Sequence, residues 1–328
     1  MTGRERIIAA LTGKACDCVP YYESQIDEQI VATLFGSCSS EVEVSLQCGR
    51  DHVPLFMFAP IPVKREATAA GQAFLGHRIA SFNEIQEFKL PDVEEVNFLQ
   101  PLQELVASAH ANGLAVNILL GFGVDAVINS VGLDKFAFAL YDCPQVVCAT
   151  IEKYATWAKS VIQKAIDLGV DFIWVGDDIA WKGGPFFSPD LFRRWILPVI
   201  RPVAAAITVP WIFHSDGNIL PLVEDLLSLG MNAIHPLEPE SVDIVEFKKR
   251  YGHRITVVGN VAVDKLARGT PSEVADEVKL RLSQLAPGGR YIISSSNSIP
   301  NYVKPENYRA MIDTIAKYRK CVGFGVID

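Results

Sequence analysis

The feature that most constrains this chain is a regular alternation, from about residue 100 onward, of short apolar runs and longer segments with a helical period. The short runs are rich in Val and Ile, which is typical of parallel strands buried under crossover helices. We expect strands at Ala115 to Leu120, Asp171 to Val175, Pro210 to His214, Ala233 to Leu237, Ile255 to Gly259 and Tyr291 to Ser295. We expect helices near residues 144–168, 189–207, 219–229, 241–251, 271–286 and 305–319. This pattern predicts an α/β protein.

The first hundred residues supply the remaining strands. Val19 to Glu23 and His52 to Phe58 have the pattern of strands, and an irregular excursion follows from Pro60 to Pro91. Within it, Arg78 to Phe82 can pair as an extra strand, so the count is eight or nine. Units of roughly 35 to 40 residues, with no linker between them, favour a single (β/α)8 TIM barrel over a doubly wound sheet. We therefore expect residues 1–328 to form one barrel domain.

Composition excludes several classes of function. Thirty Lys and Arg against 38 Asp and Glu give a formal net charge of −8 without a basic run, so nucleic acids and anionic membranes are not expected partners. The seven cysteines are an odd number without a CxxC pair, which argues against a disulfide framework. The amino-terminal stretch carries charges, unlike a signal peptide, and no window approaches the roughly 18 to 20 apolar residues of a membrane span. We expect a soluble, cytoplasmic protein.

In a (β/α)8 barrel the active site forms at the carboxyl ends of the strands. Asp177 and Asp178 follow directly on a fully apolar strand. Since two adjacent carboxylates cannot both point outward, we expect Asp178 to point inward with Asp177 as its support. The alternative is that such an Asp caps the following turn.

His214 and Asp216 are a sharper signal. Two residues apart at the end of one strand, they lie on the same side and can converge on one metal ion or one substrate group. The alternative is a histidine bonded to a nearby carbonyl, with Asp216-Gly217 as an ordinary turn. His235, which precedes a proline, has the pattern of a satisfied core histidine.

The mouth of such a barrel is acidic. Its acids are Glu23, Asp177, Asp178, Asp216, Glu238 and Glu240, with Lys182 as the main cation nearby. Crowded carboxylates raise one another's pKa, so this arrangement favours a metal, a cationic substrate or a proton shuttle. Aromatic residues near the strand ends can line an apolar pocket, with simple packing as the alternative: Tyr21, Tyr22, Phe58, Phe122, Trp181 and Phe186.

Several motifs are found together in one known superfamily. They are Arg4-Glu5-Arg6-Ile7-Ile8-Ala9-Ala10-Leu11 leading to Val19-Pro20, Asp177-Asp178 before Ser188-Pro189, His214-Ser215-Asp216-Gly217, Gly259-Asn260-Val261, and Gly288-Gly289-Arg290 running to Ile299 with Pro305-Glu306-Asn307 behind it. Over nearly the whole chain, the sequence resembles the uroporphyrinogen decarboxylase superfamily. The resemblance implies a (β/α)8 barrel, in agreement with the alternation of strands and helices.

That superfamily holds two chemistries: cofactor-free removal of acetate carboxylates from uroporphyrinogen, and methyl transfer between corrinoid proteins, thiols and methyl donors. The decarboxylases carry an Arg-rich signature directly after the first strand. Here the corresponding stretch, residues 19–28, contains no Arg and three acids. Eight substrate carboxylates over this surface would be electrostatically unfavourable, so a decarboxylase is the alternative rather than the first expectation.

The methyltransferase branch typically holds a zinc ion through a His-x-Cys pair and a later Cys. By resemblance these positions are His214, Asp216 and Asn297, so both thiolates are missing. A His and a carboxylate can still bind Zn²⁺, whereas Asn is a poor third ligand. The third ligand would then come from one of three acids: Asp178, Glu23 or Glu238.

The resemblance therefore implies an enzyme that takes a methyl group from a small methylated compound, such as an aryl methyl ether or methylamine, and hands it to a corrinoid protein. We expect His214, Asp216 and Asp178 to be catalytic, with His214 and Asp216 as metal ligands. The expected substrate-binding residues are Glu23, Tyr22, Asp177, Trp181, Glu238 and Asn297. A third interpretation is a barrel that has lost catalysis and docks a corrinoid protein. Docking requires an open mouth, so a homodimer would form through the outer helices.

Overall fold

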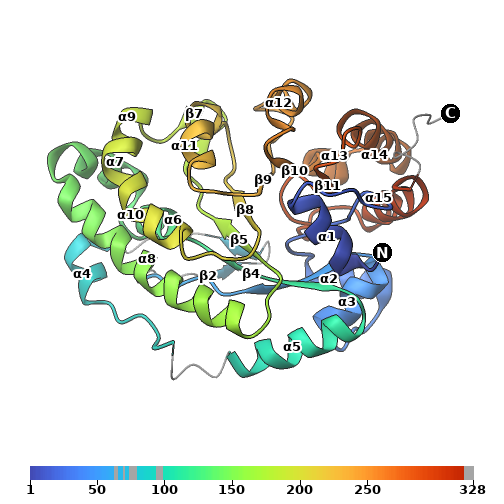
Figure 1. The fold of residues 1–328 in the computed structure, drawn as a ribbon, viewed down its shortest axis with the longest axis horizontal. Coiled ribbons are helices and arrows are strands. Elements are labelled where there is room, and N and C mark those ends of the chain that lie inside the picture. Colours follow the sequence, from blue (N-terminus) through green and yellow to red (C-terminus); the bar gives the residue numbers. More distant parts are fainter. Residues whose placement is uncertain (63–65, 69–70, 74–79, 94–98, 321–328) are drawn as a thin grey trace.

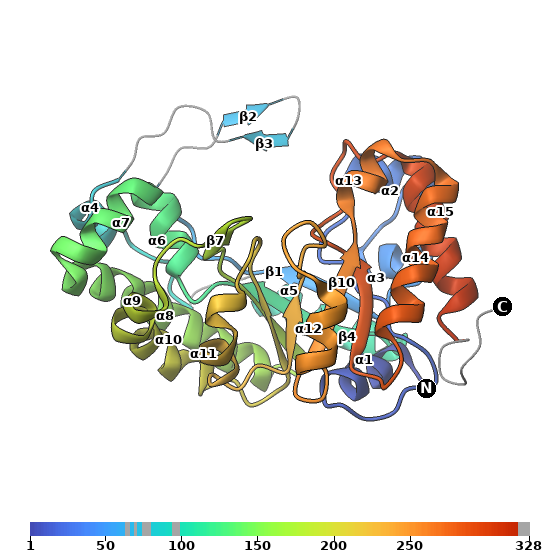
Figure 2. The ribbon, with the colours of Figure 1, turned by 90° about the horizontal axis from the view of Figure 1, so that it is seen from above.

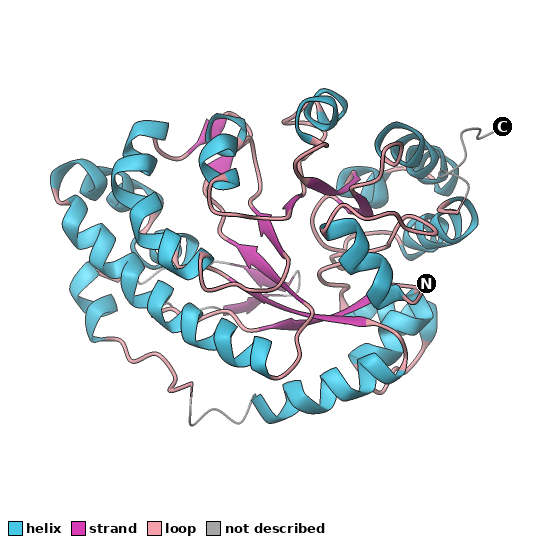
Figure 3. Ribbon diagram, in the orientation of Figure 1, coloured by secondary structure: helices cyan, strands magenta, loops and turns pink. Residues whose placement is uncertain are grey.

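Seven parallel strands form one curled sheet, surrounded by helices (Figures 1 and 3). The computed structural model describes residues 1–62, 66–68, 71–73, 80–93 and 99–320. In sheet order, the strands are β1 (His52–Phe56), β4 (Ala115–Leu120), β5 (Phe172–Gly176), β8 (Trp211–His214), β9 (Ala233–His235), β10 (Thr256–Val261) and β11 (Tyr291–Ser295). Each agrees with a predicted strand to within about two residues, so the barrel-type α/β fold is confirmed.

The segment that precedes β1 joins the two edges of this sheet. The Tyr22 amide donates to the Ile293 carbonyl of β11 at 3.0 Å, and the Asp51 amide, next to β1, donates to the Tyr21 carbonyl at 3.0 Å. Residues 19–23 thus take the place of the eighth predicted strand, although their ladder is reduced to an isolated parallel bridge between Tyr21 and Ile293.

Helices cover the outside of the barrel (Figure 1). They are α1 (Gly3–Leu11), α2 (Glu28–Phe35), α3 (Glu41–Cys48), α4 (Phe82–Glu87), α5 (Leu99–Ala111), α6 (Val124–Val131), α7 (Leu133–Asp142), α8 (Pro144–Asp167), α9 (Pro189–Leu191), α10 (Leu197–Ala204), α11 (Val223–Leu227), α12 (Ile244–Tyr251), α13 (Val263–Arg268), α14 (Pro271–Leu285) and α15 (Pro305–Tyr318). Two short antiparallel pairs lie off the main sheet (Figure 2): β2 (Glu66–Thr68) with β3 (Gly71–Ala73), and β6 (Ala180–Trp181) with β7 (Gly184–Pro185). Within the described ranges, none of these helices is long and apolar enough to cross a membrane.

Proline divides two of the predicted helices. The helix expected at 189–207 is built from α9, a π-helical turn at Phe192–Ile196 and α10, and Pro198 and Pro202 lie in its last part. Neither proline has an amide hydrogen, so each leaves an interruption in the regular i to i−4 bonding. The helix expected at 219–229 begins as a 3-10 turn at Leu220–Leu222 before α11.

The extra strand expected at Arg78 to Phe82 needs a correction. Residues 78 and 79 lie outside the described residues, and the rest begins helix α4 instead of a strand. Ser81 is its N-cap, and Ser81 and Glu84 form a capping box, which satisfies the first free amides of the helix.

Alternate residues of each strand face the interior of the barrel, because side chains on a strand alternate between two faces. The apolar part of this interior consists of Ala115, Leu119, Phe172, Trp174, Ile212, Ala233, Val258 and Ile292, with Tyr22 and with Ile7, Ala10 and Leu11 of α1. Helix α1 lies at the end of the barrel opposite the carboxyl ends of the strands (Figure 2). The same alternation brings several buried polar residues onto the inner face: Asn117, His214, His235, Asn260 and Ser294. The interior is thus apolar near α1 and becomes polar toward the mouth.

Candidate active site at the barrel mouth

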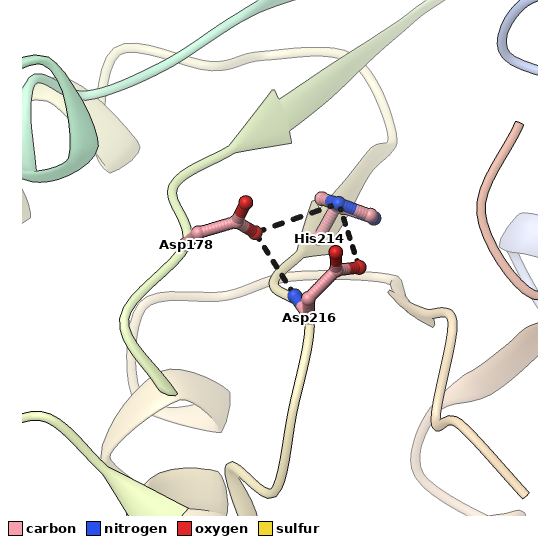
Figure 4. A group of neighbouring side chains, drawn as sticks. All are labelled: Asp178, His214 and Asp216. Atoms are coloured by element: carbon pink, nitrogen blue, oxygen red, sulfur yellow. Dashed lines mark hydrogen bonds and ion pairs between the residues drawn. The ribbon is translucent and has the colours of Figure 1, made fainter. Parts of the chain in front are cut away.

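A histidine and two aspartates meet where β5 and β8 end (Figure 4). Nε2 of His214 lies 3.6 Å from Oδ1 of Asp178 and 3.6 Å from Oδ1 of Asp216. His214 is the last residue of β8, Asp216 lies in the loop after it, and Asp178 follows β5. The Asp216 amide also donates to Oδ1 of Asp178 at 2.9 Å, which ties the two loops together. We call these three side chains the mouth cluster.

Glycine lets the loop after β8 pass close to its neighbour. Gly217 has a φ of +81°, and a Cβ there would lie 2.6 Å from backbone atoms of Trp181. Its amide donates to Oε2 of Glu238 at 3.1 Å, and the Asn218 amide donates to the Trp181 carbonyl at 2.9 Å. A side chain at position 217 would push this loop away, and Asp216 would move with it.

Burial sets the protonation of the mouth cluster. Desolvation lowers the pKa of His214 to about 3, so the imidazole is neutral at physiological pH. Desolvation, together with the charges of Asp178 and Glu238, raises the pKa of Asp216 to about 7. Burial also raises the pKa of Asp178. The cluster therefore combines a neutral imidazole with the carboxyl group of Asp216, which titrates near neutral pH.

Asn297 and Glu238 fix the position of Asp216 within the mouth cluster. Nδ2 of Asn297, just after β11, lies 3.0 Å from each carboxylate oxygen of Asp216 and donates to them. Glu238 accepts from the Gly217 amide and from the Ser241 hydroxyl, so it supports the loop that carries Asp216.

The side chains of the remaining predicted substrate-binding residues contact groups outside the cluster. Asp177 accepts from the Phe122 and Asp125 amides at 2.7 and 2.9 Å, and Trp181 is 64% exposed at the rim. Glu23 is fully buried, and its two oxygens lie 2.7 Å from the amide nitrogen and the hydroxyl of Ser295.

Tyr22 is inside the barrel, stacked on His52 with ring centroids 4.2 Å apart. Among the aromatic residues named as pocket candidates, Phe58 lines a cavity at the mouth, whereas Tyr21 and Phe122 belong to the outer core.

Two residues that contact His214 were not expected from the sequence. Nδ1 of His235 lies 2.6 Å from Nδ1 of His214, and the Trp174 ring stacks on His214 with centroids 4.4 Å apart. His214 and His235 are directly paired in the register of β8 and β9. The expectation that His235 is a satisfied core histidine is wrong for one nitrogen, since its buried Nε2 has no hydrogen-bond partner within the described residues. The shared spacing of Ile212-x-His214 and Ala233-x-His235 was the signal that could have revealed this pair.

The mouth cluster fits a divalent metal ion. Each side chain offers one ligand atom, and these atoms all lie within 4.8 Å of one another. Neighbouring ligand atoms of a tetrahedral Zn²⁺ site lie about 3.3 Å apart, close to the two His214–carboxylate distances. Of the three acids proposed to complete the shell, Asp178 is the one that joins this group, since Glu23 contacts Ser295 and Glu238 supports the Gly217 loop. Asn297 contacts Asp216 through its amide nitrogen, so it would orient Asp216 and would not itself bind the ion.

Fold and site together define a barrel protein with an imidazole and two carboxylates at the carboxyl ends of its strands. Residues 68–318 match the family model described as uroporphyrinogen decarboxylase (URO-D). The chain belongs to the uroporphyrinogen decarboxylase family.

Curated relatives carry names from both chemistries. The chain is 23% identical over 206 residues to uroporphyrinogen decarboxylase of Shewanella halifaxensis, covering 58% of this chain and 55% of that protein. It is 23% identical over 181 residues to methylated-thiol–coenzyme M methyltransferase of Methanosarcina mazei, covering 50% of this chain and 47% of that protein. The chain spans about half the length of the curated relatives it matches.

Two solved structures share the fold. A methyltransferase from Methanosarcina mazei superposes with a TM-score of 0.74 at 17% identity, covering 97% of this chain and 99% of that one. A B12-independent methionine synthase from Shewanella sp. W3-18-1 superposes with a TM-score of 0.54 at 13% identity, covering 92% of this chain and 96% of that one. At these identities the likeness shows the fold alone.

Proposed function

We propose that this protein is a methyltransferase that moves a methyl group between a small methylated compound and a corrinoid protein. The observation that carries the proposal is the mouth cluster, an imidazole with two carboxylates at the functional end of the barrel. The proposal treats residues 1–328 as one barrel domain. Glu238, next to the cluster, adds negative charge, which disfavours the binding of a polycarboxylate such as uroporphyrinogen. Decarboxylation is therefore the alternative function.

Demethylation of a heteroatom requires that the leaving atom be protonated or its charge be neutralised. With a pKa of about 7, Asp216 holds a proton in a large share of molecules at neutral pH, and Asn297 fixes the orientation of its carboxyl group. His214 stays neutral and directs Nε2 toward the same point. Alternatively, a divalent ion held by Asp178, His214 and a deprotonated Asp216 would supply Lewis acidity there.

The test is methylation of cob(I)alamin by a panel of methylated donors, with metal analysis of the purified full chain. We expect methylcobalamin to form, and Asp216→Asn to reduce its rate by about 100-fold or more, in the range typical of a lost acid-base group. A barrel that only docks a corrinoid protein would be unaffected by Asp216→Asn. Coproporphyrinogen formed from uroporphyrinogen, or no transfer from any donor, would contradict the proposal.

A further inference from the structure

A cavity of about 280 Å³ opens beside the mouth cluster, among the ends of β1, β4 and β5. Its walls include the apolar side chains of Phe58, Ala59, Ile61 and Ala126. Gly121 and Gly176 also line it, and a Cβ on Gly121 would lie 2.8 Å from the Gly176 carbonyl. These two strand ends therefore pass close together and leave the base of the cavity without side chains. Asp177 lines the same cavity, so it adjoins Asp178 of the cluster.

The carboxylates of this cavity are already supplied with donors. Both oxygens of Asp177 accept main-chain amides, from Phe122 and Asp125, and Oδ1 of Asp125 accepts from the Asn129 side-chain amide at 2.7 Å. A cationic ligand would have to compete with these bonds, so the acids do not favour one.

Tyr154 also contributes to the cavity wall. Tyr154 is 1% exposed, and its hydroxyl has no hydrogen-bond partner within the described residues. The nearby Ser130 hydroxyl donates instead to the Ala126 carbonyl at 2.7 Å. Since the Tyr154 hydroxyl has almost no accessible surface, it does not face the cavity, and the side chain of Tyr154 presents apolar atoms to it.

We propose that this cavity binds a neutral, mostly apolar molecule of the size of one substituted aromatic ring. The volume is sufficient, since an engineered apolar cavity of about 150 Å³ holds benzene. The inference rests on the proposed function in one respect: it makes this molecule the methylated substrate, placed next to Asp178.

The cavity on the other side of the cluster has the opposite character and supplies a control. It measures about 400 Å³ and is lined by charged residues, among them Lys182, Glu238, Asp264 and Arg268. It also contains Ala267 on α13, a half-buried alanine that corresponds to Ala126 on α6. The same substitution can therefore be made on both sides of the mouth cluster.

Calorimetric titration of the full chain tests the proposal with four one-ring probes: methoxybenzene, toluene, benzylammonium and benzoate. We expect methoxybenzene to bind at least tenfold more tightly than the two ions. Ala126→Phe should abolish binding, whereas Ala267→Phe should leave it intact. Toluene should bind within a few-fold of methoxybenzene, because contact with the apolar walls supplies most of the affinity.

Tighter binding of benzylammonium than of methoxybenzene, or unchanged binding in Ala126→Phe, would each overturn the inference. Circular dichroism and thermal unfolding establish that each variant is folded. Since calorimetry requires no turnover, binding without methyl transfer would reject only the proposed function. Methyl transfer that is insensitive to Ala126→Phe would reject only this inference.

Discussion

Two sets of the same residue types lie in different parts of the barrel. The interior set is Glu23, His52 and Asn117, and the mouth set is Asp216, His214 and Asn297. In both sets the histidine is buried and stacked on an aromatic ring, His52 on Tyr22 and His214 on Trp174. In both sets burial lowers the pKa of the histidine and raises that of the acid.

The sets differ in what the imidazole nitrogens contact. Nε2 of His52 accepts from the Glu23 amide at 3.2 Å, and its Nδ1 lies 2.7 Å from Oδ1 of Asn117. His214 instead directs Nε2 at two carboxylates that are 44% and 38% exposed. His52 begins its strand and His214 ends its strand, so only His214 lies at the end of the barrel where loops and ligands meet. Residue type therefore does not distinguish the two histidines, whereas their place along the strand and the groups that Nε2 faces do.

The largest expected effect separates the two histidines. His214→Ala should lower methyl transfer by about 10²- to 10⁴-fold, as the loss of an acid-base or ligand group does, with a smaller change in stability. His52→Ala leaves the Glu23 amide and the Asn117 carbonyl oxygen unpaired in the interior, so it should cost about 2 to 5 kcal/mol of unfolding free energy. Denaturant unfolding and rates per folded molecule measure both. The comparison fails if His52→Ala abolishes turnover while the chain remains fully folded.

The strands, and the place of His214 on one of them, were predictable because they depend on local sequence. Apolar runs mark each strand, and strand alternation places His214 on the inner face, but Asp216 lies in the loop after β8, so its approach to His214 also depends on that loop. The shared spacing marks both histidines, but the contact of His214 with His235 also depends on the register between β8 and β9, which local sequence does not determine. Glu23 was placed at the mouth for a similar reason: its strand was found, but the contact with Ser295 comes from the closing edge of the barrel.

The second prediction concerns the buried acid of the interior set. Burial raises the pKa of Glu23 from 4.5 to about 8, so between these values the folded chain holds a proton that the unfolded chain releases. Stability of the unmodified protein should therefore fall as pH rises through this window, by up to about 1.4 kcal/mol per pH unit from this group. Glu23→Gln can keep both contacts with Ser295 and should remove that slope. Denaturant unfolding at pH 5 and pH 8 gives the difference directly.

The same measurement on Asp216, the acid of the mouth set, provides the comparison with Glu23. Asp216→Asn should alter the pH dependence of stability only below about pH 7. The change should be smaller than that caused by Glu23→Gln, because solvent screens a carboxyl that is 38% exposed. Methyl transfer should remain within a few-fold in Glu23→Gln. Equal slopes for the unmodified protein and Glu23→Gln would show that Glu23 is not a neutral buried acid.

The smallest expected effect distinguishes the two asparagines. Asn297 donates to both oxygens of Asp216, and these bonds hold the pKa of Asp216 down against burial. Asn297→Ala should therefore move the Asp216-dependent limb of the pH–rate profile to higher pH and slow the reaction roughly two- to tenfold, the worth of about one hydrogen bond. Asn117→Ala should leave the profile in place and lower stability instead, because it leaves a nitrogen of His52 unpaired. A pH–rate profile that moves for Asn117→Ala but not for Asn297→Ala would contradict this comparison. It would mean that the interior set, rather than the mouth set, controls the proton that the reaction uses.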